Sequence, residues 1–203
     1  MNYLAHLFLS SESPEALVGA MLGDFVKGSM KNTYPIVIRR GIELHRSIDT
    51  FTDAHEIVRD TKRLFSSERR RFAGILLDIF FDHYLAKNWS EYGDMELENF
   101  TAQAYQNLQS QTEWLTPDLA KVVPMMSRED WLGNYQRIDW VEFTLTRLAK
   151  RVRRGEMIAT GIDELRENYE AFEISFAKFF PELIAFVAAE KSSQPLDEPG
   201  FSR

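Results

Sequence analysis

Cysteine is absent from the 203 residues of this sequence. Its absence excludes disulfides, thiolate metal sites and cysteine nucleophiles, and it agrees with a cytoplasmic protein. No apolar run is long enough to span a bilayer, and the first residues lack the basic flank of a secretory signal, so we expect no membrane partner. Positive charge is scarce as well, since 31 Asp and Glu outnumber 24 Lys and Arg and leave a net charge of −7. A chain of this charge is not expected to bind nucleic acid.

Glycine and proline, at 10 and 7 residues, are too sparse for a β-sandwich. Only residues 1–9 are compatible with a strand, whereas apolar residues elsewhere recur at helical spacing. Helix starts such as Ser13-Pro14-Glu15, and others near residues 116 and 127, separate the segments. We predict the main helices at about residues 13–25, 35–48, 53–65, 66–85, 96–111, 139–153 and 163–190. The sequence therefore predicts one all-α domain, a helical bundle over residues 1–190, followed by a flexible tail over residues 191–203.

The most apolar of these helices carries two carboxylates, Asp78 and Asp82. At this spacing the two side chains lie one above the other on the same face of the helix. In an apolar setting the carboxylates repel, and burial keeps one of them protonated unless a cation neutralises the pair. A divalent metal is the more economical interpretation. The alternative is that one Asp caps a helix or pairs with an arginine of a neighbouring helix.

His45 and Asp49 repeat this spacing at the end of another predicted helix. Together they offer a second chelating face, and two helices that each give ligands one turn apart can hold a metal between them. Asp24 follows Gly23, which would leave room for a ligand, although a feature of the helix end explains it equally well. His6 sits among leucines, where a packed histidine is slightly favoured over a ligand.

Four motifs occur in the same order as in acyl carrier protein phosphodiesterases. They are Asn2-Tyr3-Leu4-Ala5-His6, Gly23-Asp24-Phe25-Val26-Lys27-Gly28, His45-Arg46-Ser47-Ile48-Asp49 with Thr52-Asp53, and Asp78-Ile79-Phe80-Phe81-Asp82-His83-Tyr84 with Trp89. The chain resembles this family to about residue 185. The family is similar to a divergent branch of the HD-domain phosphohydrolases, so the resemblance implies an HD-domain-like helical bundle. The order of Asp82 and His83 is the reverse of the usual HD pair.

The resemblance implies hydrolysis of holo-acyl carrier protein, in which 4′-phosphopantetheine is cut from its serine and the apo carrier remains. It also implies a divalent cation, typically Mn²⁺, and a site of carboxylates and imidazoles suits Mn²⁺, Mg²⁺ or Fe²⁺. Such an ion lowers the pKa of a bound water and neutralises charge on the phosphoryl oxygens. Our hypothesis gives metal binding to Asp24, His45, Asp78 and Asp82, an orienting or ligating role to Asp49, and proton transfer to the departing serine oxygen to His6 or His83.

Docking of an acidic carrier protein on this acidic chain needs a local basic patch. Two basic runs qualify, at residues 69–71 and 147–154. The second run lies at the C-terminus of a predicted helix. Positive charge there interacts favourably with the helix dipole, so helix stability alone can explain the run. The first lies in the opening turns of a helix, where positive charge opposes the dipole. We therefore expect Arg69, Arg70 and Arg71 to contact the carrier. The sequence does not indicate whether the protein is a monomer or an oligomer.

Two other functions stay open on the sequence alone. One is an HD-like phosphohydrolase that cuts a nucleotide or another small phosphoester at the same metal site, and it predicts that small diesters turn over as well as holo carrier. The other is a non-catalytic helical binding module whose Asp residues serve as caps and ion pairs. It predicts no stoichiometric metal and no loss of stability on chelation.

Overall fold

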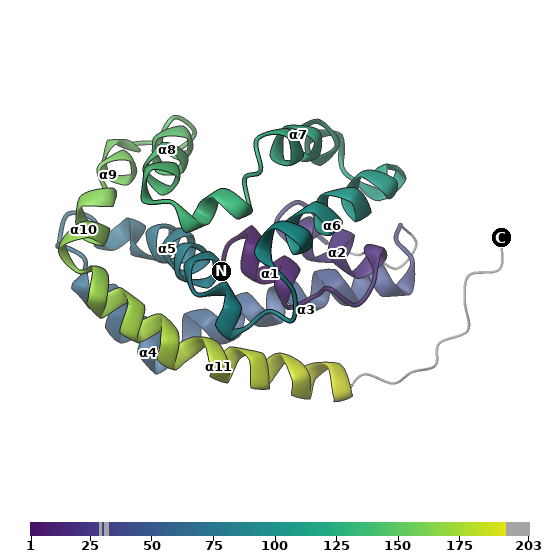
Figure 1. Cartoon of the computed structure of the whole chain (residues 1–203), viewed down its shortest axis with the longest axis horizontal. Coiled ribbons are helices and arrows are strands. Elements are labelled where there is room, and N and C mark those ends of the chain that lie inside the picture. The colour runs from purple at the N-terminus through teal and green to yellow at the C-terminus, as the bar shows by residue number, and fades with distance from the viewer. Residues whose placement is uncertain (29, 31–32, 194–203) are drawn as a thin grey trace.

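Helices follow one another throughout the residues that the computed structural model describes, which are 1–28, 30 and 33–193 (Figure 1). The α-helices are α1 (Tyr3–Phe8), α2 (Pro14–Leu22), α3 (Ile36–Ala54), α4 (Glu56–Thr61), α5 (Ala73–Lys87), α6 (Leu97–Ser110), α7 (Pro117–Arg128), α8 (Ile138–Ala149), α9 (Glu156–Ala159), α10 (Ile162–Glu167) and α11 (Tyr169–Ser193). Short 3-10 turns are η1 (Lys62–Leu64), η2 (Arg70–Phe72), η3 (Trp89–Glu91), η4 (Thr112–Trp114) and η5 (Gly133–Gln136). No strand occurs in these residues, which confirms the all-α prediction.

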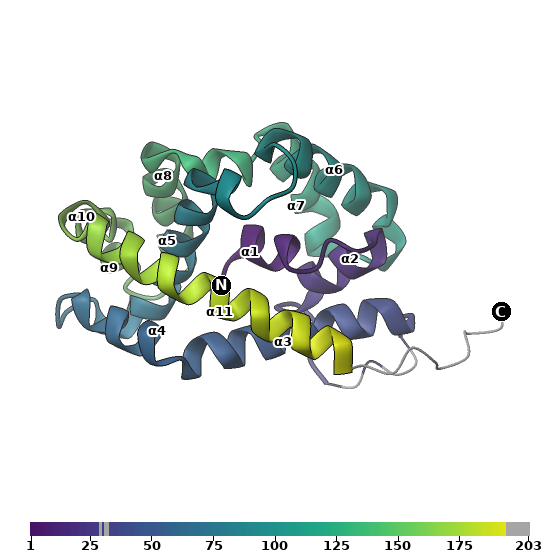
Figure 2. The ribbon, with the colours of Figure 1, turned by 60° about the horizontal axis from the view of Figure 1, so that its bottom comes forward.

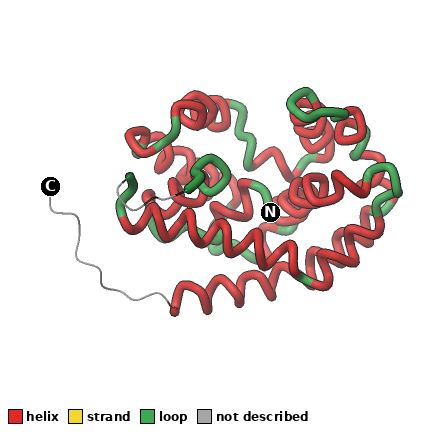
Figure 3. Tube along the Cα trace, turned by 180° about the vertical axis from the view of Figure 1, so that it is seen from behind, coloured by secondary structure: helices red, strands yellow, loops and turns green. Residues whose placement is uncertain are grey.

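The long helices α3 and α11 run along one side of the molecule, and α6 to α8 lie on the opposite side (Figures 1 and 2). The short helix α1 lies in the middle and contacts both α2 and α5. Mostly short loops connect the helices (Figure 3). Because α5 is covered by α1 on one face and by α11 on another, nearly all of its side chains are buried.

Phenylalanines fill the core between α5 and α11. The rings of Phe80 and Phe172 lie 5.3 Å apart, and those of Phe81 and Phe176 lie 5.5 Å apart. All four side chains are fully buried. Each contributes about 1.5–3 kcal/mol when it leaves water, and edge-on ring contacts of this kind add to that. This packing holds α5 at a fixed depth in the molecule.

Helix starts agree with the sequence where a cap is local. The Ser13 hydroxyl accepts a hydrogen bond from the Ala16 N–H at 3.1 Å, and Thr116 does the same for Leu119 at 3.4 Å. Two segments depend on distant contacts that the sequence does not show. Within residues 1–9, which the sequence left open to a strand, residues 3–8 form α1, and the Asp82 carboxylate accepts hydrogen bonds from its first turn.

The expected start of α5 was wrong: the sequence placed it at residue 66, and it lies at Ala73. Glu164 accepts hydrogen bonds from the Ser66 N–H and from the Arg69 guanidinium, and these contacts hold the intervening residues in turns. The segment expected as one helix over 163–190 is divided into α10 and α11. Helix α11 continues to Ser193, into the predicted tail, and residues 194–203 of that tail lie outside the described residues.

The backbones of α2 and α3 touch where they cross. A Cβ on Gly19 would lie 2.5 Å from the Ile38 carbonyl oxygen, and a Cβ on Gly41 would lie 2.8 Å from the Gly19 Cα. Any side chain at either position therefore meets backbone, which cannot move aside. Close approach of helices through small residues brings the next turns of both helices together as well.

Across residues 1–28, 30 and 33–193, no helix combines the length and the apolar character needed to cross a bilayer.

We predict that Gly41→Ala destabilises the protein by about 1–3 kcal/mol, because the added methyl group collides with the backbone of α2. Gly74→Ala in α5 is the matched control, since a Cβ there meets only the tip of Lys62 at 3.9 Å. That change should be neutral or stabilise by up to about 1 kcal/mol, through better helix propensity. Urea unfolding of both variants tests this. Equal stability of the two would show that the close crossing is unimportant.

Candidate active site

Two histidines from different helices stack in the interior. The rings of His6, from α1, and His45, from α3, lie 3.7 Å apart between centroids and 10° from parallel. Both side chains are buried. Two stacked imidazoles repel when both are protonated to imidazolium. Neighbouring charges therefore decide which of the two rings is charged.

The backbone of α2 fixes the orientation of His45. Its Nδ1–H donates a hydrogen bond to the Ala20 carbonyl oxygen at 2.7 Å, so Nε2 is the nitrogen that can bind either a second proton or a cation. Gly23 makes room for the ring, since a Cβ there would lie 2.1 Å from the His45 Cγ. The Nε2 atom is buried and has no hydrogen-bond partner among the described residues. A histidine whose other nitrogen is held by a carbonyl is the usual arrangement of a metal ligand.

Carboxylates surround this free nitrogen. The His45 Nε2 lies 3.4 Å from Asp24 Oδ1 and 3.3 Å from Asp49 Oδ2. His6 contributes from the other side, with its Nε2 3.2 Å from Asp49 Oδ1 and 3.2 Å from the Met1 carbonyl oxygen. Ligand atoms of His6, His45 and Asp49 all lie within 4.8 Å of one another. The donor set and the unpaired nitrogen therefore fit a divalent cation.

The protonation states follow from burial and from these carboxylates. Burial lowers the pKa of His6 to about 4, so this ring is neutral at pH 7. Burial also acts to lower the pKa of His45, but Asp24 and Asp49 outweigh it and raise the value to about 9. Asp49 has a pKa well below its ordinary range, because the two histidines overcome the effect of its own partial burial. At pH 7, therefore, His45 carries the one imidazolium proton of the His6–His45 pair, and this proton lies between the carboxylates where a cation could bind.

An acidic cavity of about 240 Å³ opens beside the triad. Asp24, Asp49 and Asp78 line it, and their side chains are 57%, 40% and 39% exposed. The Met1 amino group lies 3.0 Å from Asp78 Oδ1 and 3.4 Å from Asp49 Oδ1. A phosphodiester anion that enters this cavity meets several carboxylates, whose charge the Met1 amino group offsets only in part.

Asp78 and Asp82 lie on the same face of α5, as their spacing predicts, but they have different partners. Both oxygens of Asp82 accept backbone N–H groups, from Leu4 at 2.8 Å and from Ala5 at 3.2 Å. The side chain is fully buried, and burial raises its pKa to about 7 despite these bonds. Asp82 thus caps α1, the helix that carries His6.

His83 points away from the cluster. Its Nδ1 donates to the Tyr135 carbonyl oxygen at 2.7 Å, and its Nε2 lies 2.8 Å from the Tyr169 hydroxyl. Burial lowers the pKa of this ring. Both nitrogens are therefore engaged, and His83 lines neither the acidic cavity nor the larger one next to it.

The three arginines expected at the carrier interface have different surroundings. Arg69 is 19% exposed and donates to Glu164 at 3.2 Å and to Thr160 at 2.8 Å. Arg70 and Arg71 are exposed. Arg71 lines a cavity of about 210 Å³ together with Arg153 and Arg154, so the fold joins the two basic runs of the sequence.

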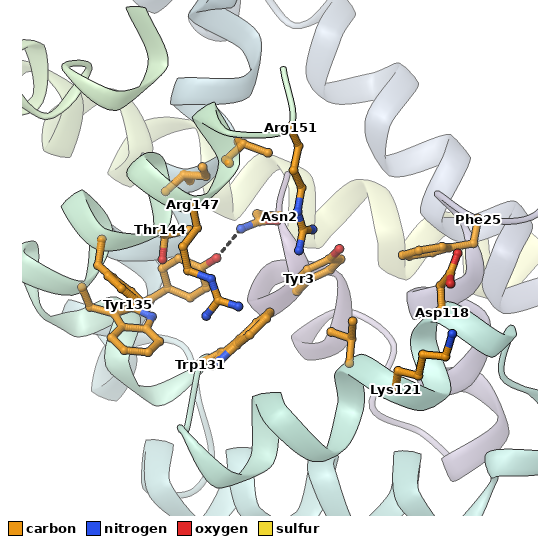
Figure 4. A pocket seen from close by; sticks show the side chains of 15 residues that line it. Asn2, Tyr3, Phe25, Asp118, Lys121, Trp131, Tyr135, Thr144, Arg147 and Arg151 are labelled. Atoms are coloured by element: carbon orange, nitrogen blue, oxygen red, sulfur yellow. Dashed lines mark hydrogen bonds between the residues drawn. The ribbon is translucent and has the colours of Figure 1, made fainter. Parts of the chain in front are cut away.

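A second, larger cavity of about 470 Å³ adjoins the acidic one (Figure 4). Asn2, Ile79 and Leu148 line both cavities. The rest of its wall comes mostly from α7, η5 and α8, and it includes Trp131, Trp140 and Arg147. Sequence reasoning missed this cavity. Its side chains come from segments far apart in the chain, and no spacing pattern connects them.

Comparisons with known proteins point to one family. The chain matches the family described as acyl carrier protein phosphodiesterase over residues 1–183. Proteins of that name from three Escherichia coli strains, E24377A (O139:H28), HS (O9:H4) and K12 DH10B, are each 33% identical to it over 186 residues. The match covers 91% of this chain and 96% of each relative. No solved structure matches the chain.

We predict that Asp82→Ala lowers the free energy of unfolding by at least about 2 kcal/mol, because two buried N–H groups of α1 lose their acceptor. Asp82→Asn keeps one oxygen and should lose less. Asp78→Ala removes a 39% exposed carboxylate from the buried Met1 amino group, which keeps Asp49 at 3.4 Å, and should change stability by only about 1 kcal/mol. Chemical unfolding in the presence of a chelator measures all three. Similar losses for Asp78→Ala and Asp82→Ala would contradict the capping role.

Proposed function

The chain belongs to the acyl carrier protein phosphodiesterase family, and from this premise we propose that it hydrolyses holo-acyl carrier protein to the apo carrier and 4′-phosphopantetheine. The observation that carries the proposal is the triad of the buried His6 and His45 with the half-buried Asp49, beside an open acidic cavity. A site that presents carboxylates to an anionic substrate is productive only with a cation. The family and the donor set thus support the same chemistry.

We further propose that His6, His45 and Asp49 hold a divalent cation, with Asp24 and Asp78 at its open side. Mn²⁺ is the first choice and Mg²⁺ or Fe²⁺ are alternatives, because the ligands are imidazoles and carboxylates without sulfur. When bound, such an ion activates water and offsets charge on the phosphoryl oxygens. The strongest support for a ligand role is the geometry of His45, whose Nδ1 is held by the Ala20 carbonyl while its Nε2 faces Asp24 and Asp49 at 3.4 and 3.3 Å.

The remaining predicted residues fit other roles in this proposal. Asp82 is a positioning residue, because it holds the helix that carries His6. The proton transfer expected of His6 stays a prediction, and full burial of this ring favours a ligand role. His83 lies outside the cavity, which favours a structural role in place of the expected proton transfer. Asp24 and Asp78 reach the cavity and are placed to orient a water there.

For the carrier itself, we propose a docking surface made of Arg70, Arg71, Arg153 and Arg154. All four are exposed, and Arg71 meets the other run at a shared cavity. Arg69 anchors this surface through Glu164. Kinship with HD-domain enzymes and a cytoplasmic location remain predictions from the sequence, and neither nucleic acid nor a membrane is part of the proposal.

We predict Mn²⁺-dependent release of 4′-phosphopantetheine from purified holo carrier, followed by mass. Asp49→Asn should lower this rate and the Mn²⁺ affinity at least about tenfold, because it removes a charge from the triad with little change of shape. Asp53→Asn is the matched control, since Asp53 lines the same cavity but pairs with Lys62 at 2.8 Å. No release despite tightly bound Mn²⁺ would overturn the substrate and turn the search to small diesters. Full activity of Asp49→Asn would overturn the site.

Charge reversal tests the docking surface. We predict that the double variant R70E/R71E raises the KM for holo carrier roughly fivefold and flattens its dependence on salt, while kcat is unchanged. Arg128→Glu, an exposed arginine at the end of α7, is the control and should leave the KM unaltered. The surface would be wrong if the double variant and the control gave the same KM.

A further inference from the structure

The larger cavity is directly continuous with the candidate active site. Asn2, Ile79 and Leu148 form the boundary between it and the acidic cavity. Its volume of about 470 Å³ is in the range of pockets that enclose small organic ligands. A group bound at the acidic cavity therefore has a neighbouring space into which one of its substituents can extend.

Exposed apolar side chains gather at these two cavities. Phe25 and Phe143, 38% and 45% exposed, line the larger one, and Ile75, 39% exposed, lines the acidic one. Within the described residues these three belong to a small group of large apolar side chains with such exposure. Exposed apolar side chains in the wall of a cavity are typical of a ligand-binding site in soluble proteins. Trp131 and Trp140 extend the wall.

Polar groups are placed among these rings. Arg147 and Arg151 extend into the cavity from α8 and the turn that follows it (Figure 4). The Arg147 guanidinium lies 4.6 Å from the Trp131 ring centre, and its Nη1 also pairs with Glu129 at 3.4 Å, so both contacts hold it in the wall. Asn2 donates a hydrogen bond to the Tyr135 hydroxyl at 2.6 Å, also at the wall. The cavity thus offers apolar surface together with donors suited to carbonyl oxygens.

A phosphodiester has two organic arms, and only one of those in holo carrier fits here. The carrier is a folded domain, which cannot enter a space of this size. The other arm is a linear, uncharged chain with a branched apolar carbon, two amides and a thiol. We propose that this cavity binds the pantetheine arm of the substrate, with its amide oxygens near Arg147 and Arg151 and its apolar parts against Phe143 and Trp131. The inference rests on the proposed function.

The test is binding of free pantetheine, which lacks the phosphate, by calorimetry with the Mn²⁺-loaded protein. T144W places a large ring at a half-buried position of the cavity wall and should weaken pantetheine binding at least tenfold. T146W is the matched control on the same helix. Thr146 is exposed, donates its hydroxyl to the Glu142 carbonyl and does not line the cavity, so binding should match the original protein.

Equal binding by all three proteins, or no binding by the original protein at about 10 mM pantetheine, would overturn the proposal. If T144W fails to fold, Phe143→Ala serves in its place, because this exposed ring can be removed without opening the core. Tighter binding of adenosine monophosphate than of pantetheine, lost in T144W, would assign the cavity to a nucleotide arm and also overturn it.

A parallel assay on holo carrier separates this proposal from the proposed function. Hydrolysis of holo carrier that is unchanged in T144W would reject the cavity and keep the function. Pantetheine binding that is lost in T144W, without any hydrolysis of holo carrier, would keep the cavity and reject the function. If T144W, but not T146W, loses both pantetheine binding and kcat/KM for holo carrier, the result supports the cavity and the proposed function together.

Discussion

The contact between α2 and α3 at Gly19 and Gly41 is the constraint on which the site depends. The two backbones touch there, and the next turn of each helix carries Gly23 and His45. The imidazole occupies the space that a side chain at position 23 would take, and its Nδ1 reaches the Ala20 carbonyl. The orientation of the His45 Nε2, which faces Asp24 and Asp49, is therefore set by helix packing, because the partner that fixes the ring is backbone.

A second device places the other ring of the stack. Asp82 binds the first N–H groups of α1, where a negative charge also favours the helix dipole, and α1 carries His6. The phenylalanine packing against α11 fixes α5 and hence this carboxylate. One histidine is thus positioned by α2 and the other by α5. The stacking of the two rings therefore depends on how these helices pack together.

Local patterns predicted much of this structure, and distant contacts account for what they missed. The shared face of His45 and Asp49 followed from their spacing alone, and the Ser13 cap was readable from neighbouring residues. A capping role for one Asp of this pair was the alternative that the sequence offered, but the helix that Asp82 caps was not predictable, because α1 is only six residues long and is stabilised by that same carboxylate. The close contact at Gly19 and Gly41 was not predictable for a related reason. A single glycine within a helix does not indicate which other helix packs against it.

Basic and acidic side chains line different cavities around the candidate site. The basic run at the end of α8 divides, with Arg147 and Arg151 facing the large cavity and Arg153 and Arg154 lying with Arg71 on the surface. Acidic side chains line the cavity beside the triad, which adjoins the large one. Arginines of both groups attract an anionic diester, whereas these carboxylates repel it. Under the proposed function, the same arrangement makes catalysis depend on the ion and leaves docking of the two arms to the arginines.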